Sequence, residues 1–352
     1  MNILRPIIAT IIALIIGLLV TSFAGENPLN VFYIFAKSGF GTPYDFGMTL
    51  TYSMPLILTG LSVAMAFKAK MFNIGAEGQL TIGALAAASV GALFPNVPHF
   101  FAIIFAGLSA AFFGGLWGGI AGYLKAKRGA HEVITTIMLN FIAAGIASYI
   151  TVYILKDTNS QNPQTIPISK NYVLEPYQFF DGAPVSAAIF LSIFVAIILW
   201  IFLYRTPYGY EIRCVGENES AASTAGISIS KTQMKTMFIA GALAGLVGVG
   251  EILGRSECFK LDFSPGYGFT GIAVAFLAKG NPLAIIFSGL LFGALQKGAS
   301  DLEIFTHNVT SDLALVLQAL IILAVSADGL WETLNFQKRQ IRNGMDQPLI
   351  FN

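Results

Sequence analysis

The sequence predicts an all-α polytopic membrane protein, and both its composition and its pattern support this fold class. Apolar residues make up 55% of the 352 residues and charged residues only 11%, whereas soluble domains are near 25% charged. Several apolar runs approach or exceed the roughly 18 residues that indicate a membrane-spanning helix. No polar segment is long enough for a large soluble domain, and no basic cluster interleaved with aromatics indicates nucleic-acid binding.

Apolar runs and helix-breaking residues, read in chain order, predict about ten spans. We expect them at residues 6–24, 46–67, 79–94, 99–124, 133–155, 184–204, 235–253, 267–279, 282–297 and 311–328. The eighth and ninth are short, and Gly280-Asn281-Pro282 between them indicates a hairpin that does not fully cross the membrane. The first run also resembles a signal peptide, because Arg5 precedes it and Ser22-Phe23-Ala24 follows it. We favour an uncleaved anchor, since the run is long enough to span.

The basic residues orient these spans. With a cytoplasmic N-terminus, fourteen of the 20 lysines and arginines fall in inside loops and six outside, so both termini are expected in the cytoplasm. We expect one transmembrane domain over residues 1–335 and a cytoplasmic tail over 336–352. The longest inside loop is 205–234. The longest outside loop, 156–183, is rich in Asn, Gln, Pro and Tyr and is typical of a structured docking segment.

Small residues recur at the spacing that lets membrane helices approach closely. Glycines four residues apart occur in three predicted spans: Gly114 with Gly118 and Gly122, Gly241 with Gly245, and Gly289 with Gly293. In lipid this spacing brings two backbones together. The 36 glycines therefore predict a compact bundle. The two cysteines, Cys214 and Cys258, fall on opposite sides of the membrane in this topology and cannot form a disulfide.

Several familiar site motifs are incomplete. His131-Glu132 begins a zinc-protease signature, but the second histidine is replaced by Thr135, so we expect no metal site. The residues 266–271 spell G-x-G-x-x-G without a preceding strand, which argues against a dinucleotide site. The sequence contains no P-loop motif and no arrangement typical of a hydrolase, so we expect no enzyme activity and no bound cofactor in this chain.

Polar side chains inside predicted spans are the candidates for function, because such groups are costly in lipid and usually face the bundle interior or a water-filled path. They are Glu77, Glu132, Glu251, Asp312, Asp328 and the amides Asn140 and Gln318. Glu132 and Asp312 lie near helix starts, where a carboxylate also suits a capping role. Glu251 can pair with Arg255 at a four-residue spacing.

Glu77 has an unusual setting, between Gly75 and Gly78 and near Asn73 and Gln79. These residues predict a broken start to the third span, which a membrane protein tolerates where the break is buried or lines a cavity; a simple helix cap is the alternative. A second glycine-rich stretch, 263–271, precedes the eighth span. Our topology places 72–79 on the inside and 263–271 on the outside, which predicts an inverted repeat of two five-helix halves.

The inside loop 205–234 contains a run of small residues at 221–226 between basic residues. Asn218 or Glu219 can cap a short helix over about 219–225. A short helix with small side chains can seat in a groove of another protein. A solvated loop is the alternative interpretation.

Four separated blocks in this chain resemble one family. They are FNIGAEGQLTIGA at 72–84, GAHEVITTIMLN at 129–140, TPYGYEIRCVGENESAASTAGI at 206–227 and GIAVAFLAKGNPLAI at 271–285. The chain is similar to permease subunits of bacterial ABC importers for branched-chain amino acids, ribose and nucleosides, and is most like the longer permease of the nucleoside branch. The resemblance covers about residues 40–330. His131 departs from the expected asparagine.

The resemblance implies a permease in the bacterial cytoplasmic (inner) membrane that works with other proteins. Its partners would be a separate ATPase subunit carrying ATP and Mg, a second and different permease, and an extracytoplasmic binding lipoprotein. The loop would carry the coupling helix that docks on the ATPase, through Arg213, Gly216, Glu217, Asn218, Ala221, Ala222 and Gly226. For the translocation path or gate we expect Asn73, Glu77, Gln79, Glu132, Asn140, Tyr267, Phe269 and Gln318.

Two alternatives remain open at this point. Within the same class, the solute can be a simple sugar, riboflavin or a branched-chain amino acid in place of a nucleoside. In a different class, the chain is an ion-coupled secondary transporter whose intramembrane carboxylates bind protons or ions. ATP dependence of uptake separates the two classes.

Overall fold

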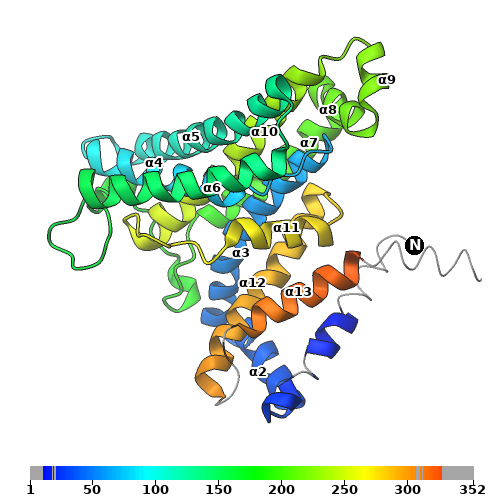
Figure 1. Ribbon diagram of the computed structural model, residues 1–352. Coiled ribbons are helices and arrows are strands. Elements are labelled where there is room, and N and C mark those ends of the chain that lie inside the picture. The colour runs from blue at the N-terminus through cyan, green and yellow to red at the C-terminus, as the bar shows by residue number, and fades with distance from the viewer. Residues whose placement is uncertain (1–10, 18, 20, 307–309, 311, 327–352) are drawn as a thin grey trace, which may run out of the picture.

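The computed structural model describes residues 11–17, 19, 21–306, 310 and 312–326, and in these ranges the chain is almost entirely helical (Figure 1). Two isolated β-bridges occur in the described ranges, one within the long connection after residue 155 (Lys156 with Thr165) and one between this connection and Lys260. The whole predicted tail 336–352, Asp328 and part of the predicted first span lie outside the described residues. The all-α prediction is confirmed for the described part of the chain.

The helices, in chain order, are α2 (Pro28–Phe40), α3 (Pro43–Phe67), α4 (Ala76–Leu93), α5 (His99–Arg128), α6 (Glu132–Tyr149), α7 (Ala188–Arg205), α8 (Pro207–Glu217), α9 (Glu219–Thr224), α10 (Ile229–Gly245), α11 (Tyr267–Leu277), α12 (Pro282–Phe305) and α13 (Leu313–Ser326). Two π-helical turns continue α6 and follow α10, at Ile150–Ile154 and Val249–Ser256 (η5). Short 3-10 turns lie at Thr21–Ala24, Lys170–Tyr172 and Gln178–Phe180.

Six helices in the described ranges are long and apolar enough to cross a membrane. They are Pro43–Phe67, His99–Arg128, Glu132–Ile154, Ala188–Arg205, Ile229–Ser256 and Pro282–Phe305. The predicted third, eighth and tenth spans are helical as well, in α4, α11 and α13. With 11 residues, α11 is roughly 16 Å long, about half of the hydrocarbon core. The eighth span is therefore short, as expected, whereas the ninth continues eight residues beyond its predicted end.

The helix α3 forms the centre of the molecule. Its residues are buried without interruption from Ser53 to Ala66, as expected for a helix that is apolar on every side. In Figure 1, α4, α5, α6 and α10 form an upper layer, and α2, α12 and α13 lie below, with α3 and α11 between them. The long connection 155–187 lies at the end of the molecule opposite α8 and α9.

Two helices, α2 and α8, were not predicted from the sequence. α2 begins at Pro28 after the capping residue Asn27, whose side chain accepts a hydrogen bond from the Leu29 amide at 2.9 Å. α8 begins at Pro207 after Thr206, which caps the Gly209 amide at 3.1 Å. Both starts carry the capping residue followed by proline that is typical of helix N-termini. Only a few residues of each helix are buried. Neither sequence therefore carries the long apolar run by which the spans were predicted.

The predicted glycine contacts are confirmed between α5 and α10. A Cβ atom on Gly241 would lie 2.3 Å from the Gly114 carbonyl oxygen, and one on Gly245 would lie 2.2 Å from the Ala110 carbonyl oxygen. The two backbones therefore touch directly. The same holds between α12 and α3, where a Cβ on Gly293 would lie 2.7 Å from the Thr49 carbonyl oxygen.

This contact gives a stability prediction. Replacing Gly241 with leucine forces α5 and α10 apart, because backbone atoms cannot move aside as a flexible side chain can. We expect a loss of at least about 3 kcal/mol, the upper range for overpacking, seen as a markedly lower melting temperature of the isolated chain in detergent. Gly145→Leu is the matched control, since a Cβ there meets nothing within 4 Å. Equal melting temperatures for both variants would contradict the backbone contact.

Candidate functional site

The segment between α3 and α4 is a helix break held together by buried amides. The side chains of Asn73 and Gln79 are 0% and 1% exposed and exchange two hydrogen bonds, of 2.8 and 2.9 Å. The Asn73 amide nitrogen also donates to the Ser62 hydroxyl at 3.0 Å. Buried polar groups are stable when they are paired in this way. The amides therefore fix the conformation of the break.

Asn140 of α6 supports the same break from the other side. Its side-chain nitrogen donates to the Ile74 carbonyl at 3.0 Å, and its side-chain oxygen accepts from the Gly78 amide at 2.8 Å. A Cβ on Gly78 would lie 2.8 Å from this oxygen, so the residue must be small. Asn140 thus supplies hydrogen bonds that a regular helix would have supplied to this backbone.

Glu77 joins the starts of two helices that are far apart in sequence. Its carboxylate oxygen Oε2 accepts a hydrogen bond from the Gly268 amide, in the first turn of α11, at 2.7 Å. The Ser264 side chain also hydrogen-bonds this carboxylate. A Cβ on Gly268 would lie 2.3 Å from the Glu77 amide nitrogen, so the two N-termini are in direct contact. Helix N-termini favour an anion, and a single carboxylate serves both.

This contact corrects one part of the sequence analysis. The stretches 72–79 and 263–271 were expected apart, on opposite sides of the membrane, but Glu77 and Gly268 are hydrogen-bonded, so the two helix starts meet inside the bundle. The reason is physical: a carboxylate that caps buried amides allows a helix to begin inside the bundle, away from either surface. Hydropathy locates the apolar run but not the depth at which the helix starts.

The other path candidates lie in different surroundings. Tyr267 is buried, at 3% exposure, whereas its neighbour Phe269 is 51% exposed. Gln318 of α13 is buried, and its amide nitrogen has no hydrogen-bond partner among the described residues. Glu132, at the start of α6, forms an ion pair of 2.8 Å with Lys125 of α5. The structure brings Asn73, Glu77, Gln79 and Asn140 together at the break and places Glu132 and Gln318 elsewhere.

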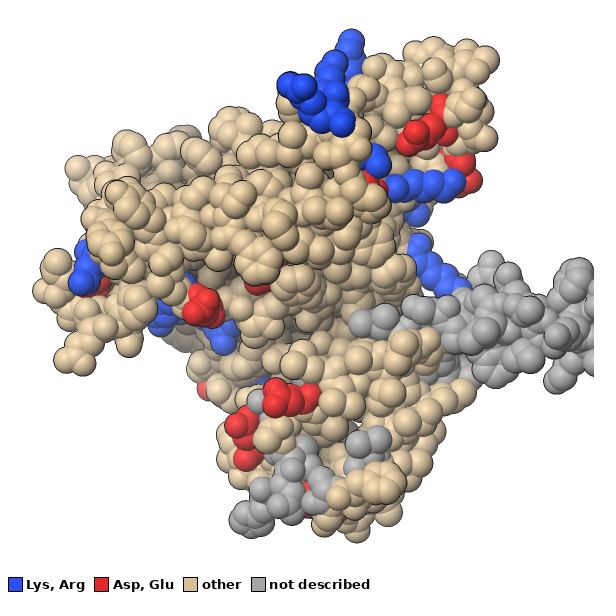
Figure 2. Space-filling view, in the orientation of Figure 1, with Lys and Arg blue, Asp and Glu red and all other residues tan. Residues whose placement is uncertain are grey.

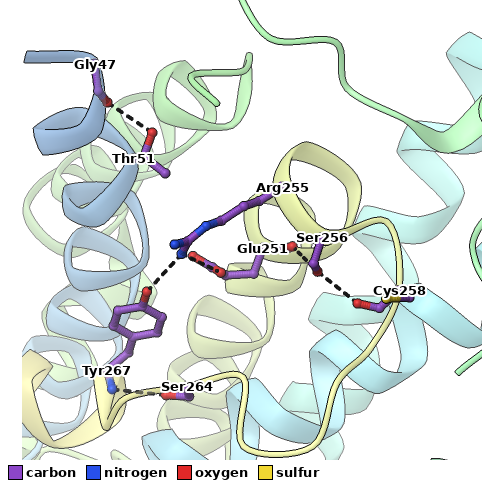
Figure 3. Close-up of polar contacts among 8 residues, drawn as sticks. All are labelled: Gly47, Thr51, Glu251, Arg255, Ser256, Cys258, Ser264 and Tyr267. Atoms are coloured by element: carbon purple, nitrogen blue, oxygen red, sulfur yellow. Dashed lines mark hydrogen bonds and ion pairs between the residues drawn. The ribbon is translucent and has the colours of Figure 1, made fainter. Parts of the chain in front are cut away.

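A second polar cluster lies at the start of α11, beside η5 (Figure 3). Arg255 pairs with Glu251, as its four-residue spacing predicted, with Nη1 and Oε2 3.3 Å apart. The same Nη1 is 3.5 Å from the Tyr267 hydroxyl, and the guanidinium lies over the Tyr52 ring, 5.5 Å from its centroid. Figure 3 shows Arg255 reaching from η5 towards Tyr267, with Glu251 alongside. This cluster joins α3, η5 and α11.

The loop 205–234 folds into two helices, α8 and α9, which we call the coupling module. The predicted short helix is confirmed: α9 covers Glu219–Thr224, and the Asn218 side chain caps it by accepting from the Ala221 amide at 3.0 Å. Gly226, in the turn after α9, has φ +83°, a left-handed conformation that favours glycine. The Glu219 carboxylate accepts from the Gln233 side chain of α10 at 3.0 Å.

A surface groove of about 380 Å³ lies on the coupling module. Its lining includes five of the predicted coupling residues, which are Arg213, Glu217, Asn218, Ala221 and Ala222. Ala221 is exposed and Ala222 is buried against the module. The Arg213 guanidinium packs over the Tyr204 ring, 5.2 Å from its centroid. The groove is thus bordered by small side chains that leave room for a side chain of another protein.

The coupling module is attached to the turn that leads into the helix break. The Lys70 ammonium donates to the Glu217 carbonyl, at the last residue of α8, at 2.9 Å, where a cation complements the helix end. A Cβ on Gly216 would lie 2.1 Å from the Lys68 carbonyl oxygen, which explains why a glycine occupies this position. Lys70 itself has φ +52°. Three residues separate Lys70 from Ile74, whose carbonyl accepts the hydrogen bond from the Asn140 side chain.

Basic side chains gather at the end of the molecule that carries the coupling module. Lys125, Lys127 and Arg128 occupy the last turn of α5, and Figure 2 shows basic side chains protruding beside α8 and α9. The Ser230 hydroxyl at the start of α10 donates to the Ala126 carbonyl at 3.3 Å. The coupling module and the basic end of α5 therefore form one face.

A comparison with known protein families identifies the family of this helical chain. A protein family described as "Branched-chain amino acid transport system / permease component" matches residues 46–326, which include the break, the coupling module and α11. The chain belongs to this permease family. The resemblance noted in four sequence blocks is thereby confirmed.

The relatives of this permease include nucleoside transporters. It is 37% identical to the guanosine ABC transporter permease protein NupP of Bacillus subtilis, over 93% of each chain. It is 32% identical to the nucleoside ABC transporter permease protein NupB of Lactococcus lactis, over 95% of this chain and 93% of the relative. It is also 30% identical to the glucose ABC transporter permease protein TsgB13 of Haloferax volcanii, over 97% and 92%.

The sequence analysis did not find the roles of Lys70, Tyr52 or Ser264. Lys70 was counted only as a basic residue of an inside loop, because no local pattern indicates a contact with a carbonyl 147 residues away. Arg255 was recognised only as the partner of Glu251. The four-residue spacing predicted the pair of Glu251 and Arg255. It could not predict the contacts of Arg255 with Tyr52 and Tyr267, because these residues lie on other helices.

Proposed function

We propose that this permease is the membrane-spanning subunit of an ATP-driven importer that translocates a nucleoside. The observation that carries the proposal is its similarity over more than nine-tenths of its length to permeases named for guanosine and nucleosides. The neutral, hydroxyl-rich solute suits a bundle whose polar groups are mostly amides, hydroxyls and paired charges. A simple sugar is the second candidate, because TsgB13 is named for glucose.

Its topology would be about ten spans with both termini in the cytoplasm. The basic residues at the end of α5 support a cytoplasmic position for the coupling module, because cytoplasmic loops carry an excess of Lys and Arg. The meeting of α4 and α11 at Glu77 supports an inverted repeat, since discontinuous helices in corresponding positions are typical of such transporters.

The partners would be an ATPase that docks on the groove of the coupling module, a second permease and a binding lipoprotein. A second permease is supported because each of two organisms has a pair of related permeases, NupB and NupC in L. lactis and NupP and NupQ in B. subtilis. The chain is similar to NupC of L. lactis and NupQ of B. subtilis as well as to NupB and NupP. It matches NupC and NupQ over about 70% of its length and NupB and NupP over 93–95%. This difference supports its assignment as the longer permease.

Reconstitution tests the proposal. The chain is co-expressed with the ATPase, the second permease and the binding protein proposed as its partners and is placed in proteoliposomes, and uptake of labelled guanosine and glucose is measured. We expect guanosine uptake that requires ATP and the binding protein and that a protonophore leaves unchanged. Uptake that continues without ATP and stops with a protonophore would show an ion-coupled transporter, and ATP-driven uptake of glucose alone would show a sugar permease.

A further inference from the structure

The cluster of Tyr52, Glu251, Arg255 and Tyr267 has the composition of a binding site and no role in the coupling described above. It lies where α3, η5 and α11 meet, one residue along α11 from the contact between Gly268 and Glu77. Ionisable residues within a membrane bundle commonly mark a solute pathway. The π-helical turn that carries Glu251 and Arg255 is a conformation found frequently at functional sites.

Arg255 has hydrogen-bonding capacity left over. In the described part of the chain, its side-chain hydrogen bonds to protein run through Nη1, to Glu251 and Tyr267. A guanidinium has five N–H donors, so Nη2 and Nε remain for another acceptor. The side chain is 32% exposed, whereas the Glu251 side chain is 7% exposed. Arg255 is therefore the more accessible member of this ion pair.

The chemistry of the cluster selects the kind of solute. Glu251 balances the charge of Arg255, so the cluster carries no net charge and does not favour an ion. The Arg255 guanidinium lies over the Tyr52 ring, and its Nη1 is 3.5 Å from the hydroxyl of the buried Tyr267, so these two side chains hold the guanidinium in place. A guanidinium held in this way binds sugar hydroxyls through charge-assisted hydrogen bonds.

We propose that Arg255, held in place by Glu251, Tyr52 and Tyr267, forms a solute-contacting subsite of the path, which binds a neutral nucleoside by its ribose hydroxyls. This rests on the proposed function. The subsite lies beside the break at which α4 and α11 begin, so a solute held there adjoins the helix ends that the coupling module can move.

The test compares two solutes that differ only in ribose hydroxyls. Uptake of guanosine and of 2′,3′-dideoxyguanosine is measured in the reconstituted complex with one saturated binding protein. In Arg255→Met we expect guanosine uptake to fall at least tenfold while the preference for guanosine over the dideoxy analogue falls towards unity. Arg255→Lys should keep part of both. Tyr153→Phe is the control, since Tyr153 is 76% exposed, and it should match the wild type.

Equal losses for both solutes in Arg255→Met would show a purely structural ion pair and overturn the proposal. A variant that does not fold is replaced by photolabelling of the wild-type complex with 8-azidoguanosine, where labelling of peptides that contain Tyr52, Arg255 or Tyr267 is expected. Labelling confined to other peptides overturns the subsite alone. A wild-type complex that takes up no guanosine overturns the proposed function, and with it the solute class assigned here.

Discussion

Replacing Ala221 with tryptophan stops ATP-dependent uptake while the transmembrane bundle stays folded. Ala221 is exposed on α9 and lines the groove of the coupling module, so an indole projects into the space that the ATPase would occupy. Its backbone amide still donates to Asn218, and the cap of α9 is therefore retained. Loss of about 2 kcal/mol at an interface hot spot reduces docking roughly 30-fold.

The measurement is uptake by the reconstituted complex together with co-purification of the ATPase and the melting temperature of the permease. Ala221→Ser is the matched control, because serine fits the same space and should leave uptake close to the wild type. Normal uptake in Ala221→Trp would show that the ATPase docks elsewhere.

Replacing Glu77 with alanine is the second substitution with a large expected effect. It removes the acceptor for the Gly268 amide and leaves two helix N-termini without their anion. An unsatisfied buried amide costs about 1–3 kcal/mol, and the contact between α4 and α11 loosens. We expect uptake to fall at least about tenfold, because a loss of about 1.4 kcal/mol corresponds to a tenfold change in an equilibrium constant. Glu77→Gln keeps an acceptor oxygen and should give an intermediate loss.

Uptake and ATP hydrolysis are measured together for the Glu77 variants. If the carboxylate positions the break, we expect hydrolysis to continue while uptake falls, because the proposed ATPase is a separate chain. Glu257→Gln is the control for Glu77→Gln, since Glu257 is an exposed carboxylate directly after η5, in the connection that leads to α11. Wild-type uptake in Glu77→Ala would show that the Glu77 carboxylate is not needed for transport and would contradict this prediction.

The features that local pattern governs were predicted well. Asn218 caps α9 because its side chain reaches an amide three residues ahead, and Glu251 meets Arg255 because one helical turn brings them together. The glycines of α5 and α10 were recognised from their own spacing. Each of these contacts depends on residues that are close in sequence or on one helix face, where geometry follows from helical periodicity.

The features that tertiary packing governs were not predictable from one sequence. Glu77 meets Gly268 across 191 residues, and no periodicity specifies which buried amide a carboxylate will find. Lys70 reaches Glu217 in the same way. Span ends were missed for a related reason: α10 begins at Ile229 rather than 235, because α9 and Gln233 hold its polar first turns in place. Such polar turns do not register in hydropathy.

The attachment of Gly216 and Lys70 has a consequence for how motion spreads through the chain. The backbone at Gly216 rests directly on that of Lys68, and a few residues later the chain is locked by the amides of Asn73, Gln79 and Asn140. Because only a few residues separate the two ends, we expect a displacement of α8 and α9 to be transmitted to the helix break. Conversely, we expect a solute bound near the break to change the resting position of α8 and α9, which would report its presence to the proposed ATPase.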